Sequence, residues 1–129
     1  MKGETEWTKN GRYTGITELK LTNNGVKQVR ESARILIRPE KVIGPRKLAH
    51  VFISPRKRAQ TTFDLLFGGI GEETLLQEKK VTTTEELAEW DYGKYEGLLT
   101  EEIRARRKEL GLDKESPWDI WRDGCEDGE

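Results

Sequence analysis

The feature that most constrains the fold is a short apolar run that passes directly into a helix-start signal. Residues 50–53 read His-Val-Phe-Ile, which is typical of a short strand, and Ser54-Pro55 follows at once. Serine caps a helix by accepting hydrogen bonds from its first N–H groups, and proline suits the first helical position. The expected helix ends at Gly68-Gly69, and a second strand is expected over residues 79–84. This alternation of strand and helix predicts an α/β architecture.

Two further helices are expected. Thr22 is a suitable N-cap for a helix over residues 23–38, where apolar residues recur at three- and four-residue spacing. Another helix is expected to begin at Thr100 and to end at Gly111. Its first turn is acidic and its last turn is basic, as the helix dipole favours.

The remaining segments are expected to be irregular. Glycines interrupt any regular period over residues 1–20, and two prolines and a glycine mark residues 39–47 as a connecting loop. Residues 113–129 are polar and contain glycine, with Trp118 and Trp121 as expected packing anchors.

Composition limits the class of protein. The 129 residues are enough for one domain, and 33% are hydrophobic against 36% charged. With 23 basic and 24 acidic residues the net charge is −1, which argues against disorder and against a general nucleic-acid or anionic-membrane surface. The single cysteine, Cys125, excludes an internal disulfide and a multi-cysteine metal site. No apolar run approaches the ~20 residues of a membrane span, so we expect a soluble cytoplasmic protein.

Arg58 is the first candidate for chemistry. It lies about one turn into the helix that Ser54 is expected to cap, where free N–H groups and a partial positive charge favour phosphate. An arginine at this point adds bidentate hydrogen bonds to phosphate oxygens. The alternative is a solvated basic helix start, which is a common feature.

Glu89 is the second candidate. It lies in the segment of residues 87–97, between Leu-Ala and Trp90 and close to Tyr92. A carboxyl group buried among aromatic and apolar neighbours resists ionisation and can then act as a general acid toward a leaving alkoxide. The alternative is a surface glutamate at the end of a strand.

Other reactive residue types favour structural roles. His50, the only histidine, lies in the apolar strand, and Cys125 has no histidine near it in sequence. Trp118 and Trp121 are better explained by packing than by ligand stacking. Residues 104–108 suit the solvated face and last turn of a helix, although one of these arginines is long enough to reach a substrate.

Four segments, in order along the whole chain, resemble motifs of the histidine phosphatase superfamily, the phosphoglycerate-mutase-like group. Residues 3–7, Gly-Glu-Thr-Glu-Trp, resemble the sequence that follows the family's Arg-His pair. Residues 54–59 resemble its phosphate-arginine helix, residues 87–93 its acid-donor motif, and residues 117–129 the segment before its later helices. Within the family, the chain most resembles the fungal sedoheptulose-1,7-bisphosphatase branch.

The resemblance implies a fold, a reaction and a site. The fold is a three-layer αβα sandwich with a mostly parallel sheet, and the reaction is metal-independent hydrolysis of a sugar-phosphate monoester through a phosphohistidine, without a cofactor. Arg58 is implied to hold the phosphate and Glu89 to donate the proton. The other implied contacts to the substrate come from Thr8, Thr14, Gly15, Tyr92 and Ser54.

The chain also departs from the family pattern. Met1 and Lys2 stand where the family has Arg-His, and the second family histidine, in an Ala-His-Gly segment, has no counterpart. Lysine is a poor replacement because its ammonium, with a pKa of about 10, is protonated at neutral pH. Residues 1–129 are therefore expected to form a partial histidine-phosphatase domain without its first strand and C-terminal third, inactive as given. Exposed sheet edges are expected to favour self-association.

Three hypotheses follow from the sequence. The first is a truncated or mispredicted product of a phosphatase gene. The second is a short, non-catalytic protein that binds sugar phosphates or a protein partner. The third, a nucleic-acid-binding module that uses the two arginine-rich runs, is the weakest because acidic residues are interspersed throughout.

Overall fold

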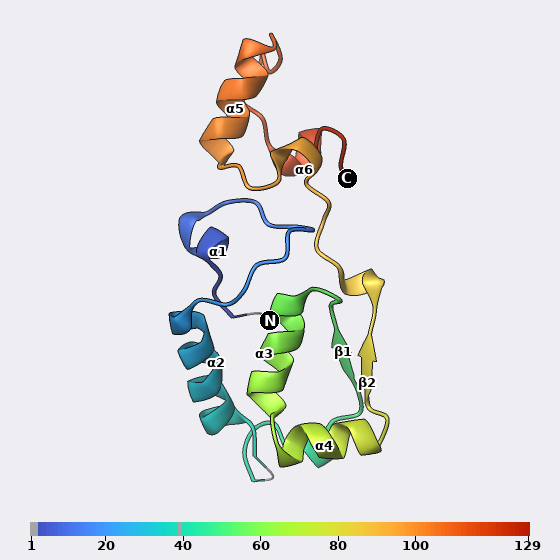
Figure 1. Ribbon diagram of the computed structural model, residues 1–129. Coiled ribbons are helices and arrows are strands. Elements are labelled where there is room, and N and C mark those ends of the chain that lie inside the picture. Colours follow the sequence, from blue (N-terminus) through green and yellow to red (C-terminus); the bar gives the residue numbers. More distant parts are fainter. Residues whose placement is uncertain (1–2, 39) are drawn as a thin grey trace. The chain divides into compact units, whose positions relative to one another are not determined.

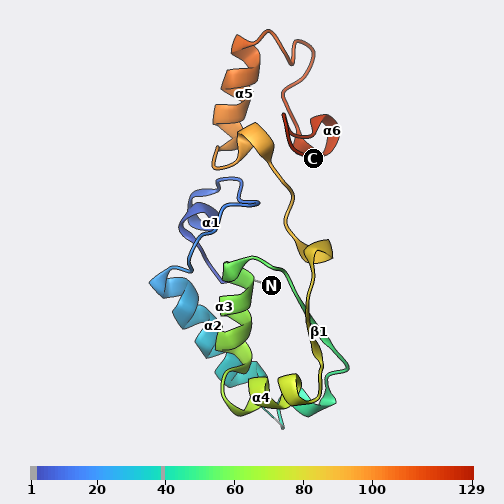
Figure 2. The same ribbon diagram turned by 45° about the vertical axis from the view of Figure 1, so that its right-hand side comes forward.

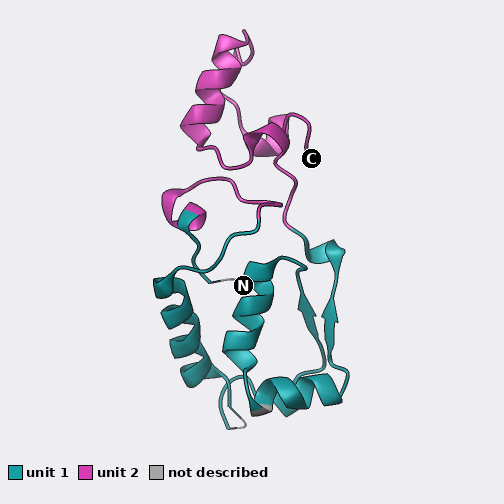
Figure 3. Ribbon diagram, in the orientation of Figure 1, with its two compact units in different colours: residues 1–6, 18–88 teal, residues 7–17, 89–129 magenta. Residues whose placement is uncertain are grey.

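The computed structural model describes residues 3–38 and 40–129. It divides the chain into two compact units that alternate along the sequence (Figure 3). The first unit comprises residues 1–6 and 18–88, and the second comprises residues 7–17 and 89–129. The expectation of one partial domain over residues 1–129 stays a prediction.

The first unit contains a two-stranded sheet and its connecting helices (Figure 1). Its elements are α2 (Asn23–Leu36), the 3-10 turn η1 (Pro45–Lys47), β1 (Val51–Ile53), α3 (Lys57–Phe67), α4 (Ile70–Gln77), β2 (Val81–Thr83) and the 3-10 turn η2 (Glu85–Leu87). The two strands are parallel, with Val51 opposite Val81 and Ile53 opposite Thr83. Parallel neighbours need a crossover, which α3 and α4 supply. The expected α/β class with parallel strands is confirmed.

The core of the first unit lies between α3, α4 and the sheet. Ile53, Phe63, Phe67 and Leu75 are buried there. Helix α3 contacts β1, and α2 packs against α3, as both ribbon views show (Figures 1 and 2). The strand alternation sends Ile53 inward, whereas the Phe52 side chain is 60% exposed on the other face.

Helix α2 forms as the sequence predicts. The Thr22 hydroxyl accepts a hydrogen bond from the Gly25 N–H at 2.9 Å, which satisfies one of the free donors of the first turn. Val29 is buried on the stripe that faces the unit. The helix ends at Leu36 rather than residue 38, because Ile37 adopts an extended conformation and pairs with Ile43.

One expectation for the first unit is wrong, and one of its helices was not expected. Helix α3 begins at Lys57 with Arg56 as its extended N-cap residue, so Ser54 and Pro55 lie outside the helix. Ser54 Oγ is 3.5 Å from the Arg56 nitrogen, too long for a good cap. The sequence also gave no signal for α4, which begins directly after Gly69, a residue with a φ of +78°.

The second unit is built from short helices around an aromatic core. Its elements are α1 (Glu6–Asn10), the 3-10 turn η3 (Gly93–Tyr95), α5 (Thr100–Glu109) and α6 (Ile120–Asp123). Tyr95, Ile103 and Trp118 are its buried residues. Helix α5 begins at Thr100 as predicted and ends at Glu109, two residues before Gly111.

The structure agrees only in part with the expected loop at the N-terminus and the expected tryptophan anchors. Residues 1–20 were expected to be loop, but α1 lies within them and Thr5 pairs with Leu21. Trp118 is an anchor, only 1% exposed, whereas Trp121 is 82% exposed and contacts the ring of Trp90. Within residues 3–38 and 40–129, no helix combines the length and apolar character that crossing a membrane requires.

Candidate active site

Arg58 lies at the second position of α3, and its side chain is almost completely buried, at 2% exposure. The next turn of the helix ties it to the N-terminal segment. Thr62 Oγ1 donates to the Arg58 carbonyl at 2.7 Å and accepts from the Gly3 N–H at 3.0 Å. Burying a guanidinium is costly, so its position indicates a specific role rather than the solvated helix start that was the alternative.

A carboxylate already lies at the beginning of α3. Glu18 Oε2 accepts from the Lys57 N–H at 2.9 Å, and Glu18 Oε1 is 4.0 Å from a terminal nitrogen of Arg56. The helix therefore takes its N-terminal acceptor from a residue 39 positions away rather than from Ser54. The first turn of α3 binds an oxyanion, and here that oxyanion belongs to the protein.

One buried donor at this turn, Arg56 Nε, lacks an acceptor among the described residues. Arg56, Lys57 and Arg58 place three cations at the end of the helix that already carries positive partial charge. Buried donors are nearly always satisfied in folded proteins, so Arg56 Nε points to an acceptor beyond Glu18.

Gly15 is held by a second carboxylate, in the second unit. Its N–H lies 2.9 and 3.0 Å from the two carboxylate oxygens of Glu96, and the Thr17 N–H donates to Glu96 Oε1 at 3.0 Å. A Cβ at position 15 would overlap the carbonyl oxygen of Trp90, so this approach requires glycine. Sequence reasoning assigned Glu96 no role, although it lies within the segment of residues 87–97.

The expected burial of Glu89 is wrong. Its side chain is exposed, because the neighbouring aromatic rings pack elsewhere: Trp90 against Trp121 and Tyr92 against Tyr13, with ring centroids 5.0 Å apart in the latter pair. Glu89 Oε1 accepts from the Trp90 N–H at 3.3 Å and from the Tyr92 hydroxyl at 3.4 Å. Its role as proton donor stays a prediction.

Burial and the nearby carboxylate of Glu89 both raise the pKa of Tyr92. Burial is the largest cause that raises the pKa of Tyr92 from 10.0 to about 12, and the charge and hydrogen bond of Glu89 add to it. The phenol therefore stays protonated at neutral pH and can donate a hydrogen bond. Tyr92 and Gly15 are also close, since a Cβ at Gly15 would lie 3.0 Å from Cδ2 of Tyr92.

The other expected site residues are distributed over the two units. Thr14 is buried in the second unit and donates to the Arg12 carbonyl at 3.1 Å, while Thr8 is exposed on α1. Ser54 belongs to the first unit, where it lines an apolar cavity of about 360 Å³ beside β1 and α3. Met1 and Lys2, the positions of the missing Arg-His pair, lie outside the described residues. The structure thus brings together Gly15, Tyr92 and Glu89 in one unit, and holds Arg58 in the other.

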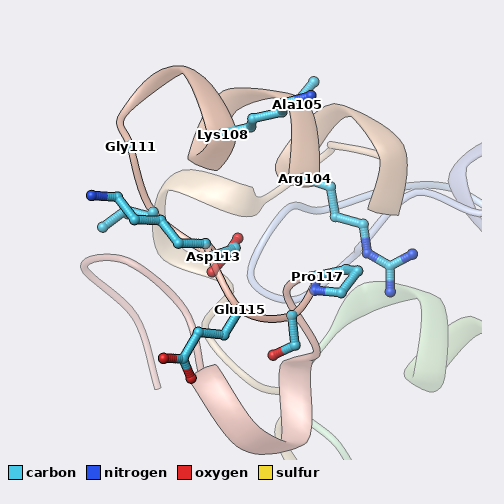
Figure 4. Close-up of a pocket in the computed structure, with 10 residues that line it drawn as sticks. Arg104, Ala105, Lys108, Gly111, Asp113, Glu115 and Pro117 are labelled. Atoms are coloured by element: carbon cyan, nitrogen blue, oxygen red, sulfur yellow. The ribbon is translucent and has the colours of Figure 1, made fainter.

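A larger cavity of about 730 Å³ lies beside α5 and contains none of these residues. Side chains from α5 and from the segment that follows it surround the cavity, with Arg104, Lys108 and Glu115 among them (Figure 4). The Arg104 Nε donates to the Trp118 carbonyl at 3.0 Å. The cavity is lined by both basic and acidic side chains, so its charge favours no single class of ligand.

Arg107, in the basic run of α5, has a structural role. It binds both carboxylate oxygens of Asp113, at 2.8 and 2.7 Å, and donates to the hydroxyl of Tyr95 at 3.0 Å. These hydrogen bonds raise the pKa of Arg107 and lower that of Asp113. This arginine therefore fixes the segment after α5 instead of reaching a substrate.

His50 and Cys125 also lie in structural surroundings. His50 Nε2 is 2.8 Å from the hydroxyl of Thr82 in β2, and its ring contacts Phe52. Burial is the largest cause that raises the pKa of the Cys125 thiol, which opposes formation of a nucleophilic thiolate. Among the residues that the structure places, no group of three or more His, Cys, Asp or Glu side chains is arranged to hold a metal ion.

Comparison with protein families identifies the chain. The model of the histidine phosphatase superfamily (branch 1) matches residues 2–129. The chain is 46% identical to the sedoheptulose 1,7-bisphosphatase of Saccharomyces cerevisiae, over 98% of this chain and 46% of that protein. It is 37% identical to an acid phosphatase of Mycobacterium tuberculosis, over 98% of this chain and 51% of that protein. The chain belongs to the histidine phosphatase superfamily, and it spans about half the length of these curated relatives.

Solved structures agree with this assignment. A functionally characterised open reading frame of Mycobacterium tuberculosis has a TM-score of 0.68 at 34% identity, with 99% of this chain and 54% of that chain covered. A phosphoserine phosphatase of Entamoeba histolytica in complex with 3-phosphoglyceric acid has a TM-score of 0.56 at 26% identity, with 98% and 52% covered. The alpha-ribazole phosphatase of Shigella flexneri, at 22% identity and a TM-score of 0.68, shows the same fold over 99% of this chain and 55% of that chain.

The contact between Glu96 and Gly15 gives a stability prediction. Glu96→Gln replaces a charged acceptor of two backbone N–H groups by a neutral amide, so the free energy of unfolding should fall by about 1–3 kcal/mol. Urea denaturation followed by the tryptophan fluorescence of the second unit measures the change. Glu109→Gln, at an exposed position in the last turn of α5, is the control and should change it by less than about 0.5 kcal/mol. Equal effects of the two substitutions would show that the Glu96 contact is unimportant.

Tyr92 gives a prediction for alkaline pH. Its folded-state pKa lies above the unfolded value, so its contribution to stability is complete below about pH 10 and is lost as the pH rises from 10 toward 12. A phenolate absorbance titration should show one late transition that Tyr92→Phe removes. Glu89→Gln should move that transition part of the way back toward 10, because burial remains. A Tyr92 transition unaffected by Glu89→Gln would contradict the contact between the two side chains.

Proposed function

We propose that this chain carries the phosphate-binding arginine and the proton donor of a phosphomonoesterase that acts on sugar phosphates. The single observation that supports this most is the start of α3. A buried arginine lies there beside helix N–H groups that already bind a carboxylate, and the buried Arg56 Nε has no partner among the described residues. Family membership and the similarity to a sedoheptulose bisphosphatase support a sugar bisphosphate as the substrate.

Each residue has a defined task in the proposed reaction. Arg58 holds the phosphoryl group and compensates its charge, and Glu89 protonates the leaving alkoxide. The exposure of Glu89 suits a group that must exchange protons with water between turnovers. Gly15, whose backbone Glu96 fixes, and the protonated hydroxyl of Tyr92 give the substrate a rigid polar wall. Thr8, Thr14 and Ser54 supply the remaining contacts.

The residue that would attack the phosphate is the part of the proposed reaction that residues 1–129 lack. The covalent phosphohistidine of the family needs a histidine before Gly3, and Lys2 stands there. His50 is engaged with Thr82, so it is no substitute. We therefore propose that the chain by itself does not hydrolyse phosphate esters. The alternative function is binding of sugar phosphates or of a protein partner without catalysis.

Two further properties accompany this proposal. Both strands of the two-stranded sheet in the described residues have an unpaired edge, which favours self-association of the isolated chain. Similarity to a sedoheptulose 1,7-bisphosphatase supports a small-molecule phosphate as the ligand, and a cytoplasmic location stays a prediction that the lone Cys125 supports.

An activity assay tests the proposal. The 129-residue chain should release no phosphate from sedoheptulose 1,7-bisphosphate. A chimera in which the chain replaces the matching segment of the Saccharomyces relative, with Arg-His restored before Gly3, should be active. In that chimera, Glu89→Gln should lower kcat by ~10²-fold or more, because the leaving group loses its acid.

One control variant and one variant of Arg58 complete the test. Glu85→Gln, at an exposed position four residues earlier, should leave kcat unchanged. Arg58→Lys should raise KM and lower kcat together, because a point charge replaces a bidentate contact. A chimera that is indifferent to both Glu89→Gln and Arg58→Lys would overturn the proposed site. Turnover by the unextended chain would show that its nucleophile is different.

A further inference from the structure

A second cavity lies in the first unit, at the opposite end of α3 from Arg58. Its volume is about 590 Å³, within the range of small-molecule sites, and the apolar part of its wall comes from Ile37, Pro45, Leu66 and Phe67. Phe67 lies nine positions after Arg58, which is about 14 Å along a helix at 1.5 Å per residue. The cavity is therefore distinct from the proposed phosphate site.

The charged residues that line this cavity are all positive. Arg38, Arg46 and Lys47 border it, and none of the described residues that line it is acidic. The side chains of Arg46 and Lys47 are exposed, and no ion pair joins any of the three cations to a carboxylate within the described residues. In a chain whose net charge is −1, three unpaired cations around one cavity are a local excess of positive charge.

The backbone around the cavity is held in place. Pro45 is buried at the start of η1, and the Lys80 ammonium donates to the Arg46 carbonyl at 3.1 Å. Gly71 of α4 lies against Pro45, where a Cβ would be 3.3 Å from the proline Cγ. The absence of a side chain there keeps the first turn of α4 close to η1. These contacts hold η1 beside α4 at the wall of the cavity.

We propose that this cavity binds a small amphiphilic anion, a molecule with an apolar body and a carboxylate or phosphate head. The apolar wall accommodates the body, and Arg38, Arg46 and Lys47 attract the head group. An inorganic anion alone would leave the apolar wall unfilled, and a neutral apolar molecule would leave the cations without a partner. The cavity thus gives the protein a ligand site separate from its phosphate-ester chemistry.

Amide chemical shifts in the 129-residue chain test the proposal with three probes. The probe 2-naphthoate has both features, 2-naphthalenemethanol is its neutral counterpart, and inorganic phosphate is an anion without an apolar body. We expect 2-naphthoate to shift the amides of residues 44, 46–47, 66–68 and 71–74 with saturation. Naphthalenemethanol should bind at least about tenfold more weakly, a difference of about 1.4 kcal/mol, and phosphate should leave these amides unchanged.

Variants identify the charges that matter. Arg46→Glu should weaken 2-naphthoate binding by about tenfold, since it removes one attraction and adds one repulsion. Arg46→Lys should retain most of the affinity, and Lys41→Glu, an exposed cation that does not line the cavity, is the matched control and should have no effect. Equal binding of the acid and the alcohol, no saturable shift at the amides beside this cavity, or equal effects of Arg46→Glu and Lys41→Glu would overturn the proposal. The test does not depend on phosphatase activity, so its outcome is independent of the proposed function.

Discussion

The second unit depends on one carboxylate. Glu96 binds the backbone N–H groups of Gly15 and Thr17 and so joins two segments that are about 80 residues apart in sequence. Backbone hydrogen bonds join the same two segments next to Glu96, and together these contacts form a junction. The Tyr13 N–H donates to the Leu98 carbonyl, and the Gly97 N–H donates to the Tyr13 carbonyl. With this junction in place, the Tyr13 ring lies against Tyr92 and Trp118 and completes the aromatic core. The positions of Gly15 and Tyr92, and therefore the polar wall proposed for the substrate, follow from it.

In the first unit, too, a carboxylate accepts a hydrogen bond from a backbone N–H, at the start of α3. There the carboxylate of Glu18 binds the Lys57 N–H and lies near Arg56, while Thr62 links the helix to Gly3. A protein carboxylate at a helix start beside three cations shows that the position favours an oxyanion. In the proposed function, a phosphoryl group uses the same preference, with Arg58 supplying the bidentate contact.

The sequence predicted features that depend on local chemistry. Thr22 as the N-cap of α2 and the start of α5 at Thr100 each follow from a few neighbouring residues, whereas the parallel sheet was implied by the family resemblance. The errors come from long-range contacts. Ser54 is displaced as the cap of α3 because Glu18, 39 residues away, supplies the acceptor. Glu89 is exposed because Trp90 and Tyr92 turn to partners that sequence proximity does not reveal, and the role of Glu96 needed knowledge of where residues 15–17 lie.

The affinity of the chain for inorganic phosphate, with and without the carboxylate of Glu18, tests the central claim most directly. If the start of α3 is the phosphate site, phosphate should shift the amides of residues 56–60, and Glu18→Gln should tighten binding several-fold because a competing anion is removed. Glu40→Gln, an exposed glutamate elsewhere in the same unit, should leave the affinity unchanged. Phosphate that causes no shift at these amides, or binding that Glu18→Gln does not change, would contradict the account.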